Sequence, residues 1–209
     1  MNKPKTQQER RENTSAAVLE SACTLFGSQG YSTTSLEDIA ADCGTTIRPI
    51  YHYFGNKKNL FLAAAERMEG RLYNALDAVE QGAPDQVKIA DYWDVFMRFG
   101  RDPAFRQIVL VDAPNILGRE RWADSPVVRR AIEVLCSLFP QLLPETRLLI
   151  AQMAVAALTE AALSLAEPGN TAKERAFEEI SSFIRLGIGH IQINVSAPDD
   201  AFKEERSIL

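Results

Sequence analysis

Two short apolar segments, separated by a glycine turn, occupy residues 34–55, and they restrict the fold more than any other feature of this 209-residue chain. We expect a capping box at the first segment, in which the Thr34 hydroxyl and the Glu37 carboxylate each satisfy a backbone amide. Gly44 provides the backbone freedom that a tight turn requires, and Thr46 is expected to cap a second helix. The spacing therefore predicts two short helices joined by a turn.

Residues 36–55, LEDIAADCGTTIRPIYHYFG, match a helix-turn-helix, in which two short helices meet at a steep angle. Ala40 is small where the helices cross closely, and Ile39, Ile50 and Tyr53 are spaced to share one apolar interior. The outer face of the second helix then projects outward, and an α-helix with its side chains fits the major groove of DNA. The motif therefore predicts DNA binding through the second helix.

The rest of the chain repeats the helical spacing of apolar residues, and no segment keeps the alternation of a β-strand. In addition to the two helices of the motif, we expect helices at about 14–28, 56–81, 85–100, 103–117, 126–139, 145–166 and 171–194. The pattern predicts an all-α fold of about nine helices. We expect a three-helix DNA-binding domain at residues 1–60 and a second helical domain at residues 61–209.

Composition excludes several other classes of protein. Three scattered cysteines and two histidines indicate neither a disulfide framework nor a metal site, so we expect no metal and no cofactor. Residues 1–13 lack the apolar core of a signal peptide, and polar side chains interrupt the most apolar stretch, residues 148–166. We judge that stretch too polar for a membrane span and expect a soluble, cytoplasmic protein with no membrane contact.

Net charge does not by itself indicate a nucleic-acid partner. The chain carries a net charge of −5, with +1 over residues 1–60 and −6 over the remainder. A DNA-binding surface must therefore be local and lie in the first third of the chain.

The exposed start of the second helix of the motif holds the side chains that can reach base edges. Arg48 is the main candidate, because a guanidinium can donate two hydrogen bonds to guanine, while Ile47 and Pro49 could touch thymine methyls. Lys57, with the amides at the start of the following helix, is expected to bind a phosphate, whereas Tyr53 fits equally well as a core aromatic residue. The expected DNA contacts are Thr34, Ser35, Thr45, Thr46, Ile47, Arg48, Pro49, Tyr51, His52, Tyr53 and Lys57.

A specific set of residues extends beyond a generic helix-turn-helix. Its members are Leu25-Phe26, Gly30-Tyr31, Thr34-Ser35, Ile39-Ala40, Gly44, the run from Ile50 to Phe54 and the run from Asn56 to Phe61. Together they resemble the TetR family of bacterial transcriptional regulators over about residues 12–72, and beyond that only the helical pattern and the length agree. The resemblance implies a recognition-helix region at 45–53, with Tyr51 and Lys57 holding the DNA backbone.

The resemblance also implies a C-terminal domain that dimerises and binds a small-molecule effector. In this family the last two helices of each subunit form a four-helix bundle, although the same residues could simply form the core of the domain. The expected homodimer interface contains Ala157, Ala161, Phe183, Ile184, Gly187, Ile188 and Ile191. Candidates for an effector pocket, each of which also fits as a core residue, are Tyr73, Trp93, Phe96, Met97, Phe105, Trp122 and Met153.

These features predict a repressor that a small molecule releases from a near-palindromic DNA operator, with half-site centres about 34 Å apart. Family members often carry a polar residue at Ile47 and a small residue at Pro49, which leaves Arg48 with more of the sequence discrimination. Two alternatives are an enzyme and a module that binds a protein partner. No catalytic motif supports an enzyme, and the joint presence of Arg48, Tyr51 and Lys57 argues against the module.

Overall fold

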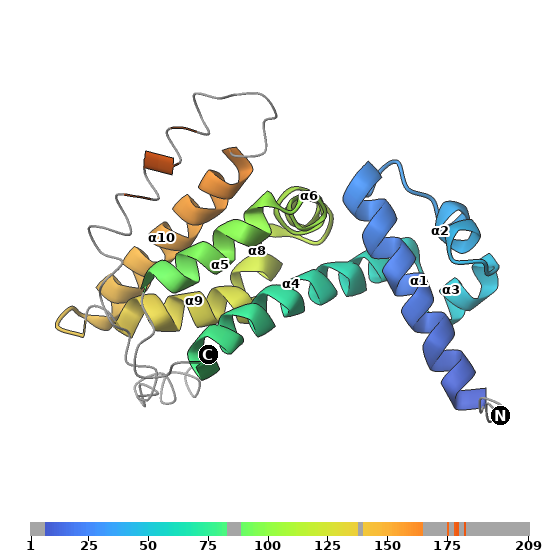
Figure 1. Ribbon diagram of the computed structural model, residues 1–209, viewed down its shortest axis with the longest axis horizontal. Helices are drawn as coiled ribbons and strands as arrows, with labels where there is room; N and C mark the ends of the chain where they lie inside the picture. The colour runs from blue at the N-terminus through green and yellow to red at the C-terminus, as the bar shows by residue number, and fades with distance from the viewer. Residues whose placement is uncertain are drawn as a thin grey trace. The chain divides into compact units, whose positions relative to one another are not determined.

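The structure, a computed structural model, describes residues 7–82, 89–137 and 140–164, and the single positions 175, 178, 179 and 182 (Figure 1). Its helices are α1 (Gln7–Gln29), α2 (Leu36–Asp42), α3 (Ile47–Phe54), α4 (Lys57–Gly82), α5 (Ile89–Arg101), α6 (Pro103–Phe105), the π-helical segment η1 (Arg106–Asp112), α7 (Ala113–Ile116), α8 (Arg119–Ala123), α9 (Pro126–Ser137) and α10 (Pro144–Ser164). The predicted all-α class is confirmed.

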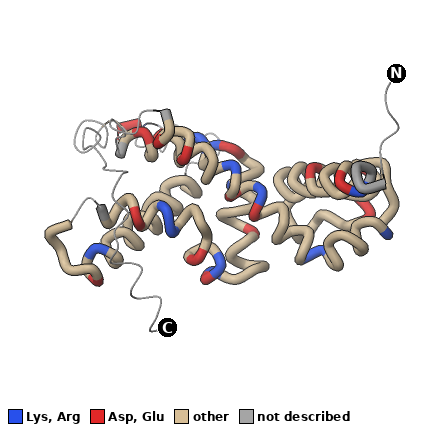
Figure 2. Tube along the Cα trace, turned by 90° about the horizontal axis from the view of Figure 1, so that it is seen from below, with Lys and Arg blue, Asp and Glu red and all other residues tan. Residues whose placement is uncertain are grey.

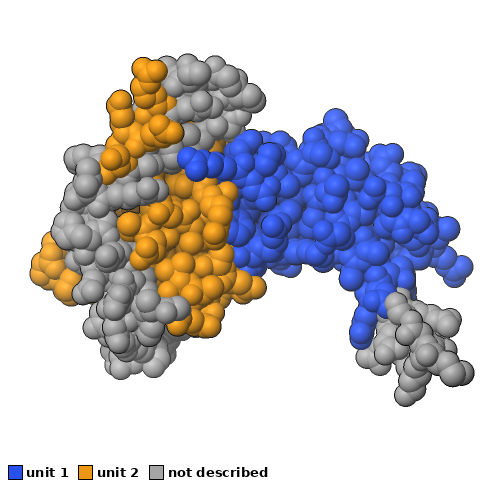
Figure 3. Space-filling view, viewed as in Figure 1, with its two compact units in different colours: residues 1–71, 99–125 blue, residues 72–98, 126–209 orange. Residues whose placement is uncertain are grey.

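The chain forms two compact units, shown in different colours in Figure 3. Unit 1 consists of Met1–Arg71 and Phe99–Ser125, and unit 2 consists of Leu72–Arg98 and Pro126–Leu209. Unit 1 thus contains the predicted helix-turn-helix together with a later segment of the chain. The division into domains at residue 60 stays a prediction.

The helix predicted at 103–117 is confirmed over residues 103–116, where α6, η1 and α7 follow one another without a gap and the middle segment is π-helical. A π-helix accommodates an extra residue per turn, and such segments are rare and short. Gly118, with φ of +103°, then ends α7 and allows the chain to enter α8, which the sequence pattern did not predict. The helix predicted at 171–194 lies outside the described residues.

The core of unit 1 forms where α1, α2, α3 and the start of α4 meet. Phe26, Ile39, Ile50, Leu60 and Phe61 are completely buried, and the rings of Phe26 and Phe61 meet edge to face with centroids 5.2 Å apart. The apolar interior predicted for Ile39, Ile50 and Tyr53 is therefore confirmed for Ile39 and Ile50, whereas Tyr53 is partly exposed. This core holds α3 with one face inward and leaves its other face toward solvent.

A close helix contact attaches α6 to α1. A Cβ atom placed on Gly27 of α1 would lie 2.5 Å from the Cβ of Ala104, which is closer than real side-chain atoms approach each other. Gly27 is buried, so the small residue is required by the lack of space. The α6–η1 segment is thereby packed on the helix that supports the helix-turn-helix.

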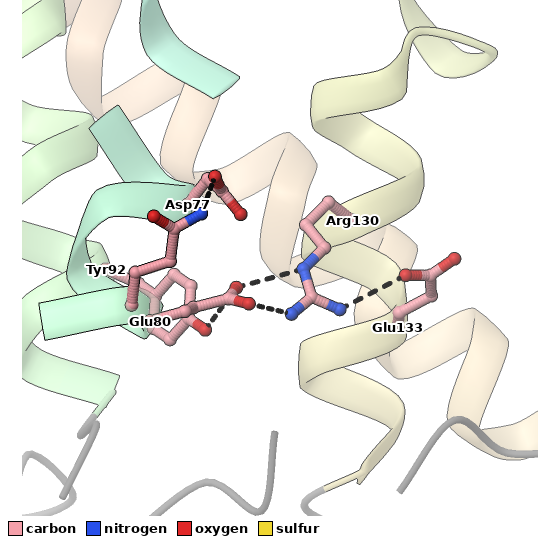
Figure 4. Close-up of polar contacts among 6 residues, drawn as sticks. Asp77, Glu80, Tyr92, Arg130 and Glu133 are labelled. Atoms are coloured by element: carbon pink, nitrogen blue, oxygen red, sulfur yellow. Dashed lines mark hydrogen bonds and ion pairs between the residues drawn. The ribbon is translucent and has the colours of Figure 1, made fainter. Parts of the chain in front are cut away.

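Unit 2 contains a polar cluster, centred on the buried Glu80, that links α4, α5 and α9 (Figure 4). Glu80 accepts hydrogen bonds from the Tyr92 hydroxyl at 2.7 Å and from Arg130 Nε at 3.0 Å, and Arg130 also forms an ion pair with Glu133 at 3.4 Å. Burial raises the pKa of the Tyr92 phenol, and its hydrogen bond to Glu80 raises it further. The cluster therefore keeps a phenol, a carboxylate and a guanidinium in mutual contact inside unit 2.

Candidate DNA-binding site

Helix α2 begins with a capping box that is shifted by one residue from the predicted one. Ser35 is the N-cap: its hydroxyl accepts a hydrogen bond from the Asp38 amide at 3.0 Å, and the Asp38 carboxylate accepts one from the Ser35 amide at 3.0 Å. Hydrogen bonds from Ser35 lower the pKa of the Asp38 carboxyl; the bond from the hydroxyl has the larger effect and the bond from the amide the smaller one. The expectation that Thr34 and Glu37 form the box is wrong.

Thr34 has a structural role instead. Its side chain is 1% exposed, and its hydroxyl donates a hydrogen bond to the carbonyl of Gly30 at 2.8 Å. The predicted DNA contact by this side chain does not fit the structure, because the hydroxyl is buried and already bonded. Ser35 is half-buried, and its hydroxyl is engaged with Asp38.

The turn between α2 and α3 has the form that the sequence predicted. Gly44 has φ of +67°, and a Cβ there would meet nothing within 4 Å, so glycine is needed for its backbone freedom alone. The Thr45 amide donates to the carbonyl of Ala40 at 2.9 Å and closes the end of α2. Gly44 thereby sets the direction in which α3 leaves the turn.

Helix α3 begins at Ile47 with Thr46 as its N-cap, as expected, but the Thr46 side chain makes no capping hydrogen bond. That part of the prediction is wrong. The side chain of Thr46 is exposed, and so the cap residue does not satisfy the first amides of the helix. The start of α3 carries a positive partial charge, which suits a phosphate oxygen.

The two faces of α3 differ sharply. Ile50 is completely buried, whereas Arg48, Tyr51 and His52 are exposed, and Tyr51 is 52% exposed. Residues three and four positions apart share a face of a helix, so these three side chains lie on one surface. The structure therefore places these three side chains together on the solvent-facing surface of α3.

The remaining predicted contacts on α3 and in the preceding turn are partly exposed. They are Thr45, Ile47, Pro49 and Tyr53. The Tyr53 ring lies edge to face with His52, with centroids 5.1 Å apart. It belongs neither to the fully buried core nor to the open face.

Charge alone does not mark this surface. Figure 2 shows basic and acidic positions interspersed along the described part of the trace, without an extended basic stripe. Helix α3 itself contains no acidic residue, while Glu37, Asp38 and Asp42 of α2 are exposed nearby in the sequence. The candidate site is therefore defined by its exposed side chains rather than by bulk charge.

Lys57, at the start of α4, lies against an aromatic ring that was not predicted as part of the site. Its Nζ atom is 4.3 Å from the centroid of the Tyr31 ring, a cation–π contact. Asn56 caps α4 as expected, because its side-chain oxygen accepts a hydrogen bond from the Asn59 amide at 2.8 Å. The pair Gly30-Tyr31, one of those that carry the family resemblance, is the sequence signal that could have drawn attention to this ring.

The candidate effector residues are divided between the two units. Phe105 and Trp122 belong to unit 1, and Tyr73, Trp93, Phe96, Met97 and Met153 belong to unit 2. Trp93, Met97 and Phe105 are buried, Phe96 and Trp122 are partly exposed, and Tyr73 and Met153 are exposed. Their role in ligand binding stays a prediction.

Helix α10 presents an exposed apolar surface. Leu149 is 58% exposed and Met153 is 65% exposed, Ala157 is exposed and Ala161 is partly buried. The other predicted interface residues lie outside the described part of the chain; they are Phe183, Ile184, Gly187, Ile188 and Ile191.

The same helix bears on the question of a membrane. Among the described residues, α10 is the one helix that is both long enough and apolar enough to cross a bilayer. Of its most apolar 18-residue stretch, 11% is buried inside the protein. By length and composition, α10 is apolar enough to span a membrane, so the expectation that this stretch is too polar for a span is wrong. Core helices of soluble proteins satisfy the same two criteria, so the finding is weak evidence for a span.

Comparisons with known proteins identify relatives of both parts of the chain. A sequence model of bacterial regulatory proteins of the tetR family matches residues 18–64, and a tetracyclin repressor-like C-terminal domain matches residues 88–186. The uncharacterized regulator YezE of Bacillus subtilis is 34% identical over 96 residues, covering 44% of this chain and 48% of YezE. The repressor AcnR of Corynebacterium glutamicum is 29% identical over 103 residues, covering 45% of this chain and 55% of AcnR. The chain thus spans about half the length of these curated relatives.

Solved structures extend the similarity over nearly the whole chain. A TetR-family transcriptional regulator from Pectobacterium atrosepticum aligns with a TM-score of 0.61 and 26% identity, covering 88% of this chain and 98% of that protein. The two matching domain models, the curated relatives and this structure all indicate one family. The chain belongs to the TetR family of helix-turn-helix transcriptional regulators.

Proposed function

We propose that this chain is a homodimeric repressor, which binds a near-palindromic DNA operator and releases it when a small molecule binds. The observation that carries the proposal is the exposed face of α3, where Arg48, Tyr51 and His52 lie opposite the buried Ile50. The name of its relative AcnR, a transcriptional repressor, supports repression rather than activation.

The side chains of α3 divide into two roles. Arg48 donates two hydrogen bonds to guanine in the major groove, and Ile47 and Pro49 meet thymine methyl groups. Tyr51 and His52 contact phosphates, which position the helix without reading sequence. Lys57 adds a further phosphate contact at the start of α4.

Two copies of the chain are needed to read a palindrome. The exposed apolar surface of α10, with Leu149 and Met153 one helical turn apart, supports pairing with the same helix of a second copy. Gln152 and Glu160 are also exposed on this helix, and lipid would leave such polar groups without partners. A soluble dimer in the cytoplasm accommodates them at the solvated edge of an interface.

Release follows if the small molecule binds better to a dimer whose two α3 helices have the wrong separation. A ligand shifts such an equilibrium only by the difference in its affinity for the two arrangements. The predicted effector contacts in unit 2 are Tyr73, Trp93, Phe96, Met97 and Met153, and Phe105 and Trp122 of unit 1 are further candidates.

The test begins with selection of DNA duplexes from a random-sequence pool by the full chain. Arg48→Ala should then weaken binding to the selected duplex by about 1–3 kcal/mol and relax the preference at one base pair, measured by fluorescence anisotropy. Lys57→Ala should weaken binding to all duplexes alike, because a phosphate contact carries no sequence information. Recovery of no enriched sequence by the parent chain, or unchanged binding in both variants, would overturn the proposal.

A further inference from the structure

A hydrogen bond joins the turn after α1 to the end of the π-helical segment. The Tyr31 amide donates to Asp112 Oδ2 at 2.7 Å, across 81 positions of sequence and within unit 1. Gly30 has φ of +83°, and a Cβ there would lie 3.2 Å from Gln107 Nε2 and 3.5 Å from Asp112 Oδ2. The Gly30–Tyr31 turn is therefore held closely against η1.

The Tyr31 ring continues this connection toward the DNA-binding surface. It stacks on Phe26, with centroids 5.8 Å apart, and meets Phe61 at 4.9 Å, so two core rings hold it in place. The Lys57 ammonium lies 4.3 Å from its centroid. One residue thus has its amide bonded to Asp112 and its ring in contact with Lys57.

We propose that Asp112 is a positioning residue for DNA binding: it holds the Tyr31 turn, and through the Tyr31 ring it places the Lys57 ammonium where it meets a phosphate. The inference rests on the proposed DNA-binding function and adds to it a residue far from the helix-turn-helix in sequence. A lysine side chain has many rotamers, and part of this conformational freedom must be lost when the ammonium binds a phosphate. A ring that already holds the ammonium reduces that cost.

Charge alone gives the opposite expectation for Asp112. An anion in the DNA-binding unit repels the phosphate backbone, so removing the carboxylate should strengthen binding if only Coulomb forces matter. Loss of the hydrogen bond leaves the Tyr31 amide without its acceptor and allows the turn to move. The sign of the change in affinity therefore distinguishes positioning from charge.

The test compares the full-length parent, Asp112→Ala, Asp112→Asn and Glu20→Ala on a duplex that the parent selects from a random pool. We expect Asp112→Ala to weaken binding about fivefold and to reduce the slope of log K against log salt by about 0.9, the value for one phosphate. Asp112→Asn keeps an acceptor oxygen and should bind at least as tightly as the parent. Glu20→Ala removes the same charge from the exposed surface of unit 1, and this variant should also bind DNA at least as tightly as the parent.

A double-mutant cycle locates the effect. In a Lys57→Ala background, Asp112→Ala should change the affinity by less than about twofold, because the ammonium that it positions is absent. Tyr31→Leu, which keeps the backbone amide and the apolar volume, should reproduce the reduced affinity and salt slope. This variant also tests the inference if Asp112→Ala fails to fold, as judged by circular dichroism.

Two results would overturn the inference while leaving the proposed function intact. They are parent-like binding by Asp112→Ala together with an unchanged salt slope, or the same fivefold loss in the Lys57→Ala background. In the case of a misfolded Asp112→Ala, parent-like binding by Tyr31→Leu would overturn it. Failure of the parent to enrich any duplex would overturn both the inference and the function on which it rests.

Discussion

The Arg121 guanidinium forms two hydrogen bonds with the Glu69 carboxylate, at 2.6 and 3.0 Å, and joins α8 to α4 within unit 1. Glu69 is 4% exposed, and burial raises the pKa of its carboxyl more than the hydrogen bond from Arg121 lowers it. A buried carboxylate that loses the cation paired with it cannot recover its hydration without opening the structure. The pair should therefore matter most when one partner is removed.

Arg121→Ala should lower the free energy of unfolding by about 3 kcal/mol, because it leaves the buried Glu69 carboxylate uncompensated. Urea denaturation followed by circular dichroism measures the change. The matched control is Glu20→Ala, which breaks the exposed ion pair with Arg67 and should cost less than about 1 kcal/mol. Equal losses in the two variants would contradict the role of burial.

Gly27→Ala should lower the free energy of unfolding by about 1–3 kcal/mol, because the added methyl group overlaps Ala104 of α6. Gly70→Ala in α4 is the control: a Cβ there meets nothing within 4 Å, and alanine should stabilise the helix by about 0.5–1 kcal/mol. Thermal and urea unfolding of both variants give the comparison. A neutral Gly27→Ala would show that α1 and α6 separate easily.

The capping box of α2 should make stability depend on pH through Asp38. Its pKa is lowered in the folded chain by the Ser35 hydroxyl and amide, so the carboxylate contributes stability above the ordinary value of 3.8. That contribution is lost as the pH falls through the folded value. The difference in unfolding free energy between the parent and Asp38→Ala should shrink from about pH 6 to about pH 3. A constant difference across urea titrations at these pH values would contradict the capping role.

Met153→Glu should convert a dimer into a monomer, because it places a charge in the centre of the exposed apolar surface of α10. Size-exclusion chromatography with light scattering measures the mass of each form. Leu143→Glu is the control, since Leu143 is 71% exposed but precedes α10, where an acidic residue suits the helix N-terminus. A monomeric parent, or a dimeric Met153→Glu, would be inconsistent with pairing through α10.

Local chemistry was sufficient to predict the helix-turn-helix. Gly44 indicates the turn, because glycine adopts a positive φ at lower cost than other residues. The spacing of Ile39 and Ile50 identifies the inward faces of α2 and α3. The exposure of Arg48 follows from the same spacing, because it lies two positions before the buried Ile50. Each of these patterns spans only a few residues, so it can be recognised in the sequence without knowledge of the fold.

Neighbouring alternatives and distant contacts were not predictable in this way. Thr34 and Ser35 both have a hydroxyl that can cap a helix. In the structure, the Thr34 hydroxyl is bonded to the Gly30 carbonyl, and Ser35 is the cap of α2. Likewise, the predicted helix takes its π-helical form at η1, the segment that packs against α1, which is far away in sequence.

The order of residues thus determined the class of fold, the family and the face of α3 that can meet DNA, since each depends on periodicity and turn chemistry along a short stretch. Only the tertiary structure brought Asp112 to the Tyr31 amide and Lys57 to the Tyr31 ring. Contacts between residues 81 positions apart depend on how whole helices pack, and one-dimensional spacing contains no measure of that packing.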